Sequence, residues 1–87
     1  MLEFMDIDDN DIKIFQSKVA ENVKKVRKEK NVTQTELALT IGHKSVSTIG
    51  KIEANLDNKH YNLEQLYKIS RALNVDVCEF FRDNKEG

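Results

Sequence analysis

The sequence contains no proline or tryptophan, only three glycines and a single cysteine, Cys78. With so few residues that break helices, and with 33% of its residues charged, the composition is typical of several short amphipathic helices. One cysteine excludes an intrachain disulfide and supplies too few sulfur ligands for a zinc site, while His43 and His60 are too far apart to form a helical ligand pair. We therefore expect an all-α domain without a metal or another cofactor.

Two further absences narrow the class of protein. No stretch approaches the ~18 consecutive apolar residues of a membrane span, and the N-terminus carries acidic residues where a secretory signal carries basic ones. The sequence has no Gly-rich phosphate loop and no set of a nucleophile with a base of the kind that an enzyme needs. We expect a soluble, cytoplasmic protein that is not an enzyme, does not bind membranes and has no evident small-molecule ligand.

Charge is distributed unevenly along the chain, whose net charge is −1. Residues 1–12 contain five acids and no base, whereas residues 13–60 contain ten Lys or Arg against five Asp or Glu, a local excess of +5. A basic segment can attract the phosphates of a nucleic acid even when the whole chain is almost neutral. The central segment is therefore a candidate for nucleic-acid binding.

Apolar periodicity predicts a first amphipathic helix that starts at Ile12 and ends near Lys30. Its packing face consists of Ile12, Phe15, Val19, Val23 and Val26. Residues 1–11 precede it as an acidic N-terminal arm, which fits a flexible segment and a short dimer contact equally well. The predicted domain covers residues 12–83, and a short tail follows at 84–87.

Capping residues mark the next two helices. Thr33 and Glu36 form a capping box that predicts a second helix, and this helix should end at Gly42, because a glycine can take the left-handed conformation of a helix C-terminus. After a short connection, Ser45 is a natural N-cap for a third helix. The predicted core residues of these two helices are Leu37, Ala38, Ile41, Ile49 and Ile52.

Two more helices follow a loop at residues 55–60. Asn62 and Gln65 form the cap of a fourth helix, which Asn74 closes, and Asp76 with Glu79 opens a short fifth helix. On the fifth helix, the simplest interpretation of Cys78 is a small buried residue. The predicted core residues of the fourth helix are Leu63, Leu66, Ile69 and Leu73. The sequence thus predicts a bundle of five helices.

The second and third helices, joined at a glycine, have the arrangement of a helix-turn-helix. A helix that enters the major groove, about 12 Å wide, needs small or slender side chains near its N-terminus, so that its backbone can approach the base edges. Residues 46–50, Val-Ser-Thr-Ile-Gly, meet this requirement. The third helix is therefore the predicted base-reading element.

Three segments also carry a family resemblance in their order and spacing. Thr-Gln-Thr-Glu-Leu-Ala at 33–38, Ile-Gly at 41–42 and Ser-Val-Ser-Thr-Ile-Gly-Lys-Ile-Glu at 45–53 resemble the Cro/C1-type (XRE) helix-turn-helix family. Residues 63–75 are similar to the fourth helix of that family, and the likeness continues to Phe81. The resemblance implies a lambda-repressor-like domain of five helices that binds double-stranded DNA as a transcriptional regulator.

The resemblance also implies roles for individual residues. It assigns base-edge contacts to Val46, Ser47 and Gly50. It assigns contacts with the DNA backbone to Thr33, Gln34, Lys44, Thr48, Lys51, Asn55, Asn58 and Lys59. Gln34 would in addition brace the reading helix.

The sequence departs from the family pattern at two places. The turn has two residues, His43 and Lys44, where one apolar residue is usual, and this insertion changes the expected approach angle of the third helix. Val46 stands where a glutamine often reads adenine, so it offers only apolar contact, for example with a thymine methyl group. More of the specificity is then expected to come from DNA shape.

A partner subunit is expected as well, because a chain of this length buries only about 60% of its unfolded surface. Tyr61 and the two adjacent aromatics of the fifth helix are core or interface residues, and one bundle face cannot bury both adjacent rings. The predicted dimer contacts are Val77, Phe80 and Phe81. A homodimer matches a palindromic operator with half-sites about 34 Å apart.

These features predict an autoregulating homodimeric repressor, of the phage type or of the restriction-modification controller type. The alternative is the antitoxin of a toxin–antitoxin pair, which binds a protein toxin and its own operator. In that case the acidic residues 3–11 would cover a basic toxin surface, or would restrain non-specific DNA binding.

Overall fold

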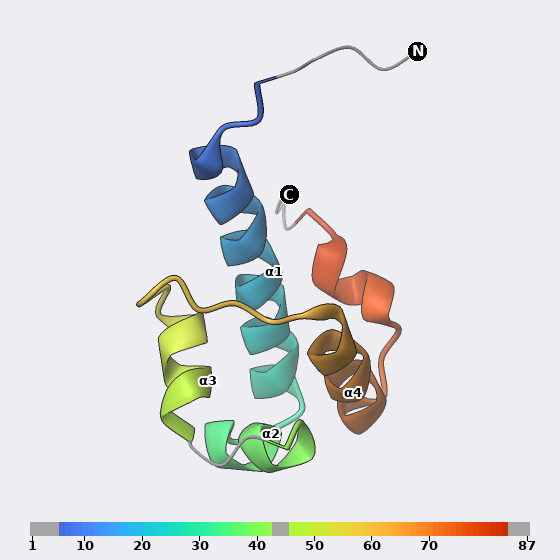
Figure 1. The fold of residues 1–87 in the computed structure, drawn as a ribbon. Helices are drawn as coiled ribbons and strands as arrows, with labels where there is room; N and C mark the ends of the chain where they lie inside the picture. Colours follow the sequence, from blue (N-terminus) through green and yellow to red (C-terminus); the bar gives the residue numbers. More distant parts are fainter. Residues whose placement is uncertain (1–5, 43–45, 84–87) are drawn as a thin grey trace.

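A computed structural model describes residues 6–42 and 46–83, and this part of the chain is helical throughout its regular structure (Figure 1). The elements are α1 (Asp9–Glu29), α2 (Gln34–Thr40), α3 (Val46–Glu53), α4 (Leu63–Leu73) and the 3₁₀ helix η1 (Val77–Phe81). The predicted all-α class is confirmed. None of the helices in these two ranges has the length and apolar character that crossing a membrane requires.

The fifth element is a 3₁₀ helix, so the prediction of five α-helices was wrong by one. Asp76 begins η1 as its N-cap, with its carboxylate accepting a hydrogen bond from the backbone N–H of Cys78. The N–H of Glu79 then donates to the carbonyl of Asp76, three residues back, which is the spacing of a 3₁₀ turn. Only five residues separate this cap from the extended backbone at Arg82, too few for a stable α-helix.

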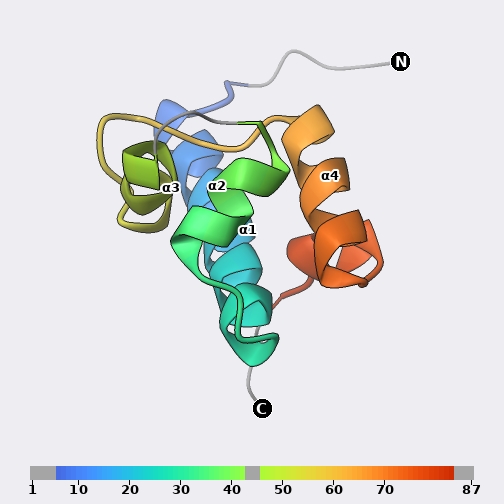
Figure 2. The ribbon, with the colours of Figure 1, turned by 90° about the horizontal axis from the view of Figure 1, so that it is seen from below.

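The long helix α1 is the central element of the fold (Figure 2). In the view from below, α3 and α4 lie on opposite sides of α1, and α2 lies in front of it. In the packing, α1 contacts α3 and η1, and α2 bridges α3 and α4. The largest fully buried side chains come from all five elements: Val23, Leu37, Ile49, Ile52, Ile69 and Phe80.

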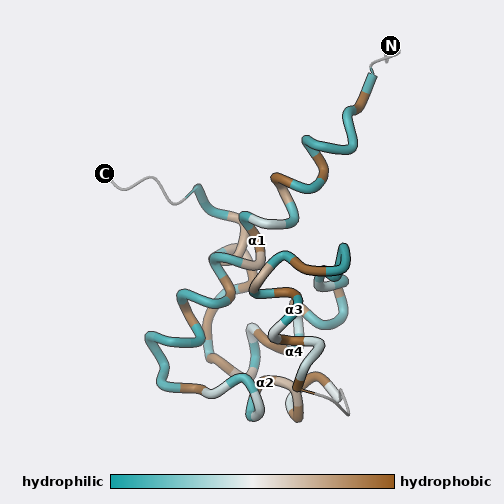
Figure 3. The backbone as a smooth tube through the Cα atoms, turned by 90° about the vertical axis from the view of Figure 1, so that its left-hand side faces the viewer, coloured by the Kyte–Doolittle hydropathy of each residue, from teal (hydrophilic) through white to brown (hydrophobic). Residues whose placement is uncertain are grey.

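Helix α1 begins three residues earlier than predicted. Asp8 is its N-cap and accepts a hydrogen bond from the N–H of Asn10, and Asp9 and Asp11 stand in the first turn, where a negative charge interacts favourably with the helix dipole. Part of the predicted acidic arm is therefore helical. The early turns of α1 project beyond the bundle, and consequently Ile12 and Phe15 are exposed although they continue the core-facing side (Figures 1 and 3).

The caps of α2 and α4 are as predicted. Thr33 with Glu36 and Asn62 with Gln65 each form a complete capping box, in which the cap side chain and the third residue satisfy each other's backbone N–H. Gly42 has φ +81°, and Asn74 is left-handed at the end of α4. A Cβ at position 42 would meet no atom within 4 Å, so the conformation alone requires glycine there.

Three predictions about burial, besides those for Ile12 and Phe15, were wrong. Leu63, expected in the core, is 78% exposed because it is the first residue of α4 and lies off the face that carries the other apolar residues. Phe80 is completely buried within its own chain and therefore offers no surface for a dimer. Cys78, expected to be buried, is exposed, and the hydrogen bond and negative charge of Asp76 raise the pKa of its thiol, which favours the unreactive protonated form.

The end of η1 is tied to α1 by a polar side chain in the core. Asn22 is 4% exposed, and its side-chain amide donates to the carbonyl oxygens of Phe80, at 2.9 Å, and Arg82, at 2.8 Å. Lys18 adds an exposed ion pair with Asp83 at 2.7 Å. The two hydrogen bonds from Asn22 satisfy carbonyls that the short 3₁₀ helix leaves without backbone partners.

Tyr61→Phe is expected to raise the free energy of unfolding by about 1 kcal/mol. The Tyr61 hydroxyl is buried and has no hydrogen-bond partner among the described residues, so the variant loses a desolvation cost and keeps the packing of the ring. Burial and the charge of Glu53 raise the pKa of this phenol, so the folded state resists ionisation and the wild type loses stability as the pH rises above about 10. Urea denaturation at pH 7 and above pH 10 checks both effects, and a less stable variant at pH 7 would contradict them.

Candidate nucleic-acid interface

Helix α3 has a buried and an outward side, as predicted. Ile49 and Ile52 are buried, whereas Val46 is 40% exposed and Ser47 is exposed beside it. Gly50 lies on the same outward side, one turn further along, and is half-buried. The outward side of α3 is therefore slender, with no side chain larger than valine among these three residues.

A network of hydrogen bonds holds the C-terminal end of α3 against α1 and α2. Arg27 binds both carboxylate oxygens of Glu53, from Nε at 2.7 Å and from Nη2 at 2.9 Å, and its Nη1 donates to the carbonyl of Val32 at 2.7 Å. Gln34, the first residue of α2, donates from its side-chain amide to Glu53 at 2.9 Å. The side chains of Arg27 and Glu53 are 8% and 4% exposed, so this is a buried bidentate pair. One carboxylate thus fixes α3 to both neighbouring helices.

Gly50 lies in a hollow of about 280 Å³ between α1, α2 and α3, which we call the helix hollow. A Cβ at position 50 would meet only the side-chain oxygen of Gln34, at 3.7 Å, which is an ordinary contact. A glycine inside a helix costs about 1 kcal/mol relative to alanine, and neither the packing nor the backbone conformation of this fold requires it. The absence of a side chain leaves the α3 backbone open to close approach from outside.

Two lysines of α1, Lys24 and Lys28, line the helix hollow together with Gln34 and Gly50. They stand four residues apart and therefore on one face of α1. Neither ammonium group is paired with an acidic side chain or another acceptor among the described residues. The hollow beside the open backbone of α3 is thus positively charged at its edge.

The loop after α3 is shaped by residues in the left-handed conformation. Asn55, Asp57 and Asn58 have φ between 57° and 59°, values that Asn and Asp tolerate better than other non-glycine residues. The N–H of Leu56 donates to the carbonyl of Lys51 at 2.8 Å, which closes α3. The loop then turns back along α1.

A family model described as helix-turn-helix matches residues 23–80, about two thirds of the chain, which includes the last third of α1 and all of α2, α3 and α4. This chain belongs to the Cro/C1-type helix-turn-helix family. It is a DNA-binding transcription regulator, and double-stranded DNA is its partner. No curated protein and no solved structure matches the chain.

Within this helix-turn-helix protein, the predicted contact residues fall into separate groups. Gln34 and Gly50 line the helix hollow, while Asn55, Asn58 and Lys59 line a second hollow on the loop. Thr33 already uses its hydroxyl to cap α2, and Lys51 pairs with Asp57 at 3.2 Å in an exposed contact. Thr48 is half-buried. The predicted N-cap Ser45 and the turn residues His43 and Lys44 lie outside the described residues.

The buried pair of Arg27 and Glu53 that supports α3 was not predicted from the sequence. Neither Arg27 nor Glu53 was assigned a role from the sequence. Each stands four residues after a fully buried residue, Val23 and Ile49 respectively, and is therefore on the core-facing side of its helix. The pair could have been predicted from this pattern, because a basic residue and an acidic residue occupy core-facing positions of two helices. Lys24 and Lys28 were missed because their position beside α3 depends on how the helices dock.

Proposed function

We propose that this protein is a sequence-specific, homodimeric repressor that binds an operator in its own promoter. The observation that carries the proposal is the glycine on the outward side of α3, which the fold does not need and which opens the helix backbone beside unpaired lysines. Val46, Ser47 and Gly50 contact the base edges, and Gln34, Thr48 and Lys51 with the loop residues contact phosphates. Repression requires only that the bound dimer occupy promoter DNA.

A second copy of the chain is the proposed occupant of an apolar groove on another face. This groove, of about 280 Å³, lies between α1, the start of α4 and Phe81, and four exposed apolar residues line it: Ile12, Phe15, Leu63 and Phe81. Phe15 and Phe81 stack with ring centres 6.2 Å apart. Leu63 protrudes at the rim of this groove, which makes the surface self-complementary. In a two-fold dimer, each Leu63 can enter the groove of the partner. Val77, the other predicted dimer contact, is half-buried against the core and is not among the residues that line this groove.

Leu63→Glu is expected to convert the protein from a dimer to a monomer. The new carboxylate would be buried against apolar side chains of the partner, which is strongly unfavourable. Sedimentation equilibrium over a wide range of concentrations measures the effect. Leu39→Glu is the matched control, since Leu39 is 72% exposed on α2 and lies outside the groove. A wild-type mass that stays monomeric at all concentrations would contradict the dimer and favour a protein partner such as a toxin.

Fluorescence anisotropy tests the function directly. Purified protein is titrated onto labelled DNA from immediately upstream of its own gene, and onto a scrambled duplex, at about 150 mM salt. Binding at least ~10³-fold tighter to the native duplex, with cooperative dependence on protein concentration, is expected of an autoregulating dimer. Equal, weak binding to both duplexes would contradict autoregulation.

A further inference from the structure

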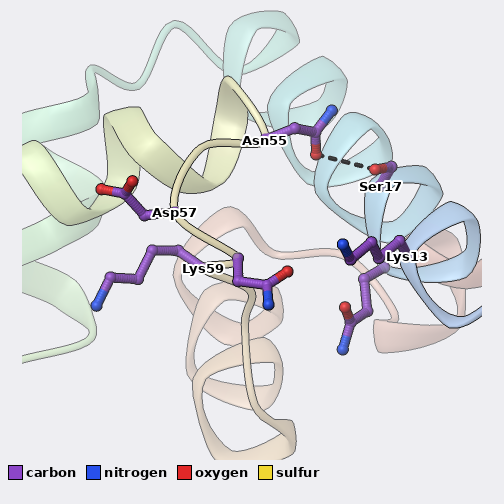
Figure 4. A pocket seen from close by; sticks show the side chains of 7 residues that line it. Lys13, Ser17, Asn55, Asp57 and Lys59 are labelled. Atoms are coloured by element: carbon purple, nitrogen blue, oxygen red, sulfur yellow. Dashed lines mark hydrogen bonds between the residues drawn. The ribbon is translucent and has the colours of Figure 1, made fainter. Parts of the chain in front are cut away.

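The loop after α3 and the first half of α1 enclose a polar hollow of about 420 Å³, which we call the loop hollow (Figure 4). Its lining combines two lysines with amide, hydroxyl and carboxylate groups: Lys13, Gln16, Ser17, Asn55, Asp57, Asn58 and Lys59. We propose that the loop hollow receives a backbone phosphate of bound duplex DNA and that Lys13 is its main cationic contact. The proposal rests on the proposed function, which it extends to a part of α1 that precedes the matched residues 23–80.

Four of the lysines without partners among the described residues line the two hollows beside α3. Lys18, Lys51 and Lys68 are each paired with a carboxylate at 2.7–3.2 Å, which satisfies their charge within the fold. By contrast, neither Lys13 nor Lys59 has an acceptor among the described residues. With Lys24 and Lys28, they place four uncompensated cations at the helix hollow and the loop hollow. Cations held without counterions are those available to neutralise phosphates.

The acidic side chain in the loop hollow does not neutralise Lys13. Asp57 is the one carboxylate of its lining, and its side chain points away from Lys13 (Figure 4). Asp57 instead pairs with Lys51 of α3 at 3.2 Å. The space in front of Lys13 is therefore bordered by side-chain amides, whose N–H groups are able to donate to a phosphate oxygen.

The hollow is also formed in advance of binding. The hydroxyl of Ser17 donates to the side-chain oxygen of Asn55 at 2.9 Å, which ties the loop to α1 (Figure 4). The left-handed backbone of Asn55 and Asn58 fixes the shape of the loop on the other side. A phosphate entering this space meets donors that are already positioned, so little ordering is required on binding.

Helical spacing links the loop hollow to the reading helix. Lys13, Ser17, Lys24 and Lys28 are separated by steps of four, seven and four residues, which place them on one side of α1. From Lys13 to Lys28 this row extends about 22 Å at 1.5 Å per residue, or roughly two thirds of a turn of DNA. The row borders first the loop after α3 and then α3 itself. This continuity favours an extended phosphate backbone as the ligand over a single free anion.

Lys13→Gln is expected to weaken binding of native and scrambled duplexes by the same factor and to lower the slope of log affinity against log salt by about 1. Equivalently, the advantage of the wild type over the variant should shrink about 3.5-fold between 50 and 200 mM salt. Lys13→Arg should restore the wild-type slope. Lys25→Gln is the matched control, because Lys25 is an exposed lysine of α1 on the side that faces η1.

The two proposals fail in different ways in this experiment. If Lys13→Gln and Lys25→Gln give the same salt slope, the proposal that the loop hollow binds a DNA phosphate is wrong. Selective binding by the wild type would still support the repressor. If the wild type does not distinguish the two duplexes, the proposed function fails, and the slopes on either duplex still decide the role of Lys13. A titration with inorganic phosphate at constant ionic strength is the third measurement. If millimolar phosphate displaces DNA from the wild type but not from Lys13→Gln, the loop hollow is a site for a free anion and not for the DNA backbone.

Discussion

Glu53→Gln is expected to lower the free energy of unfolding by about 3–5 kcal/mol, because it leaves the buried guanidinium of Arg27 without its anionic partner. The amide offers one acceptor where two carboxylate oxygens now accept from Arg27 and Gln34. Stability of small domains begins near 5 kcal/mol, so much of this variant should be unfolded at 37 °C. Circular dichroism with urea or heat as the denaturant measures the loss.

Two further variants identify the cause of that loss. Glu64→Gln breaks an exposed pair with Lys68 at 3.1 Å and should cost about 0.5 kcal/mol or less. The double variant Arg27→Met with Glu53→Leu removes both charges and should be more stable than Glu53→Gln alone, because no unpaired charge remains in the core. If Glu53→Gln unfolded at the same urea concentration as Glu64→Gln, the buried pair would not have the importance that its geometry indicates.

Val46→Glu is expected to lower the affinity for the native duplex on the order of 10²–10³-fold. A carboxylate at this outward position would face the acidic environment of the major groove, and like charges brought together at an interface cost several kcal/mol. Folding should be unaffected, since Val46 is 40% exposed and a negative charge in the first turn of α3 interacts favourably with the helix dipole. Anisotropy at about 150 mM salt measures the affinity, and circular dichroism checks the fold.

The control for this substitution is Leu39→Glu, which makes the same change of charge at an exposed apolar residue of α2. It should leave DNA binding close to that of the wild type. Val46→Ala separates the effect of the charge from the loss of the valine side chain, and is expected to reduce affinity only moderately. Equal affinities of Val46→Glu and Leu39→Glu would show that another side of α3 faces the DNA.

The features of the fold that were predicted best from the sequence are those that depend on residues close together in the chain. The capping boxes at Thr33 and Asn62 depend on residues three apart, so they could be recognised without knowledge of the tertiary structure. The same is true of Gly42, whose left-handed backbone follows from its place after α2. Helix periodicity identified the core residues Ile49 and Ile52 for a similar reason.

Predictions failed where the outcome depends on how far the bundle extends. Periodicity continues through Ile12 and Phe15, but the neighbouring elements cover these two side chains only in part, and this cannot be determined from one helix alone. Leu63 stands three residues before the buried Leu66, yet it is the first residue of α4 and lies to the side of the buried face. Phe80 and Phe81 could not be told apart in sequence, and only the docking of η1 on α1 decides which ring is buried.

The candidate site was predictable to a similar degree. The family resemblance indicated the outward residues of α3 and the loop after it, and α3 does present Val46 and Ser47 outward. It did not indicate Lys13, Lys24 or Lys28, because their relation to α3 arises from the angle at which α1 crosses it. The assignment of individual residues to bases and phosphates stays a prediction that the variants above test.

The carboxylate of Glu53 also bears on which DNA sequences this protein selects. Because it anchors the end of α3 to two other helices, the reading helix has little freedom to tilt within the groove. A mismatch between the surfaces must then be accommodated by the duplex, and the elastic energy of deforming DNA depends on its sequence. Operators with easily bent pyrimidine–purine steps between the half-sites should bind more tightly than stiff ones, although no side chain contacts those base pairs.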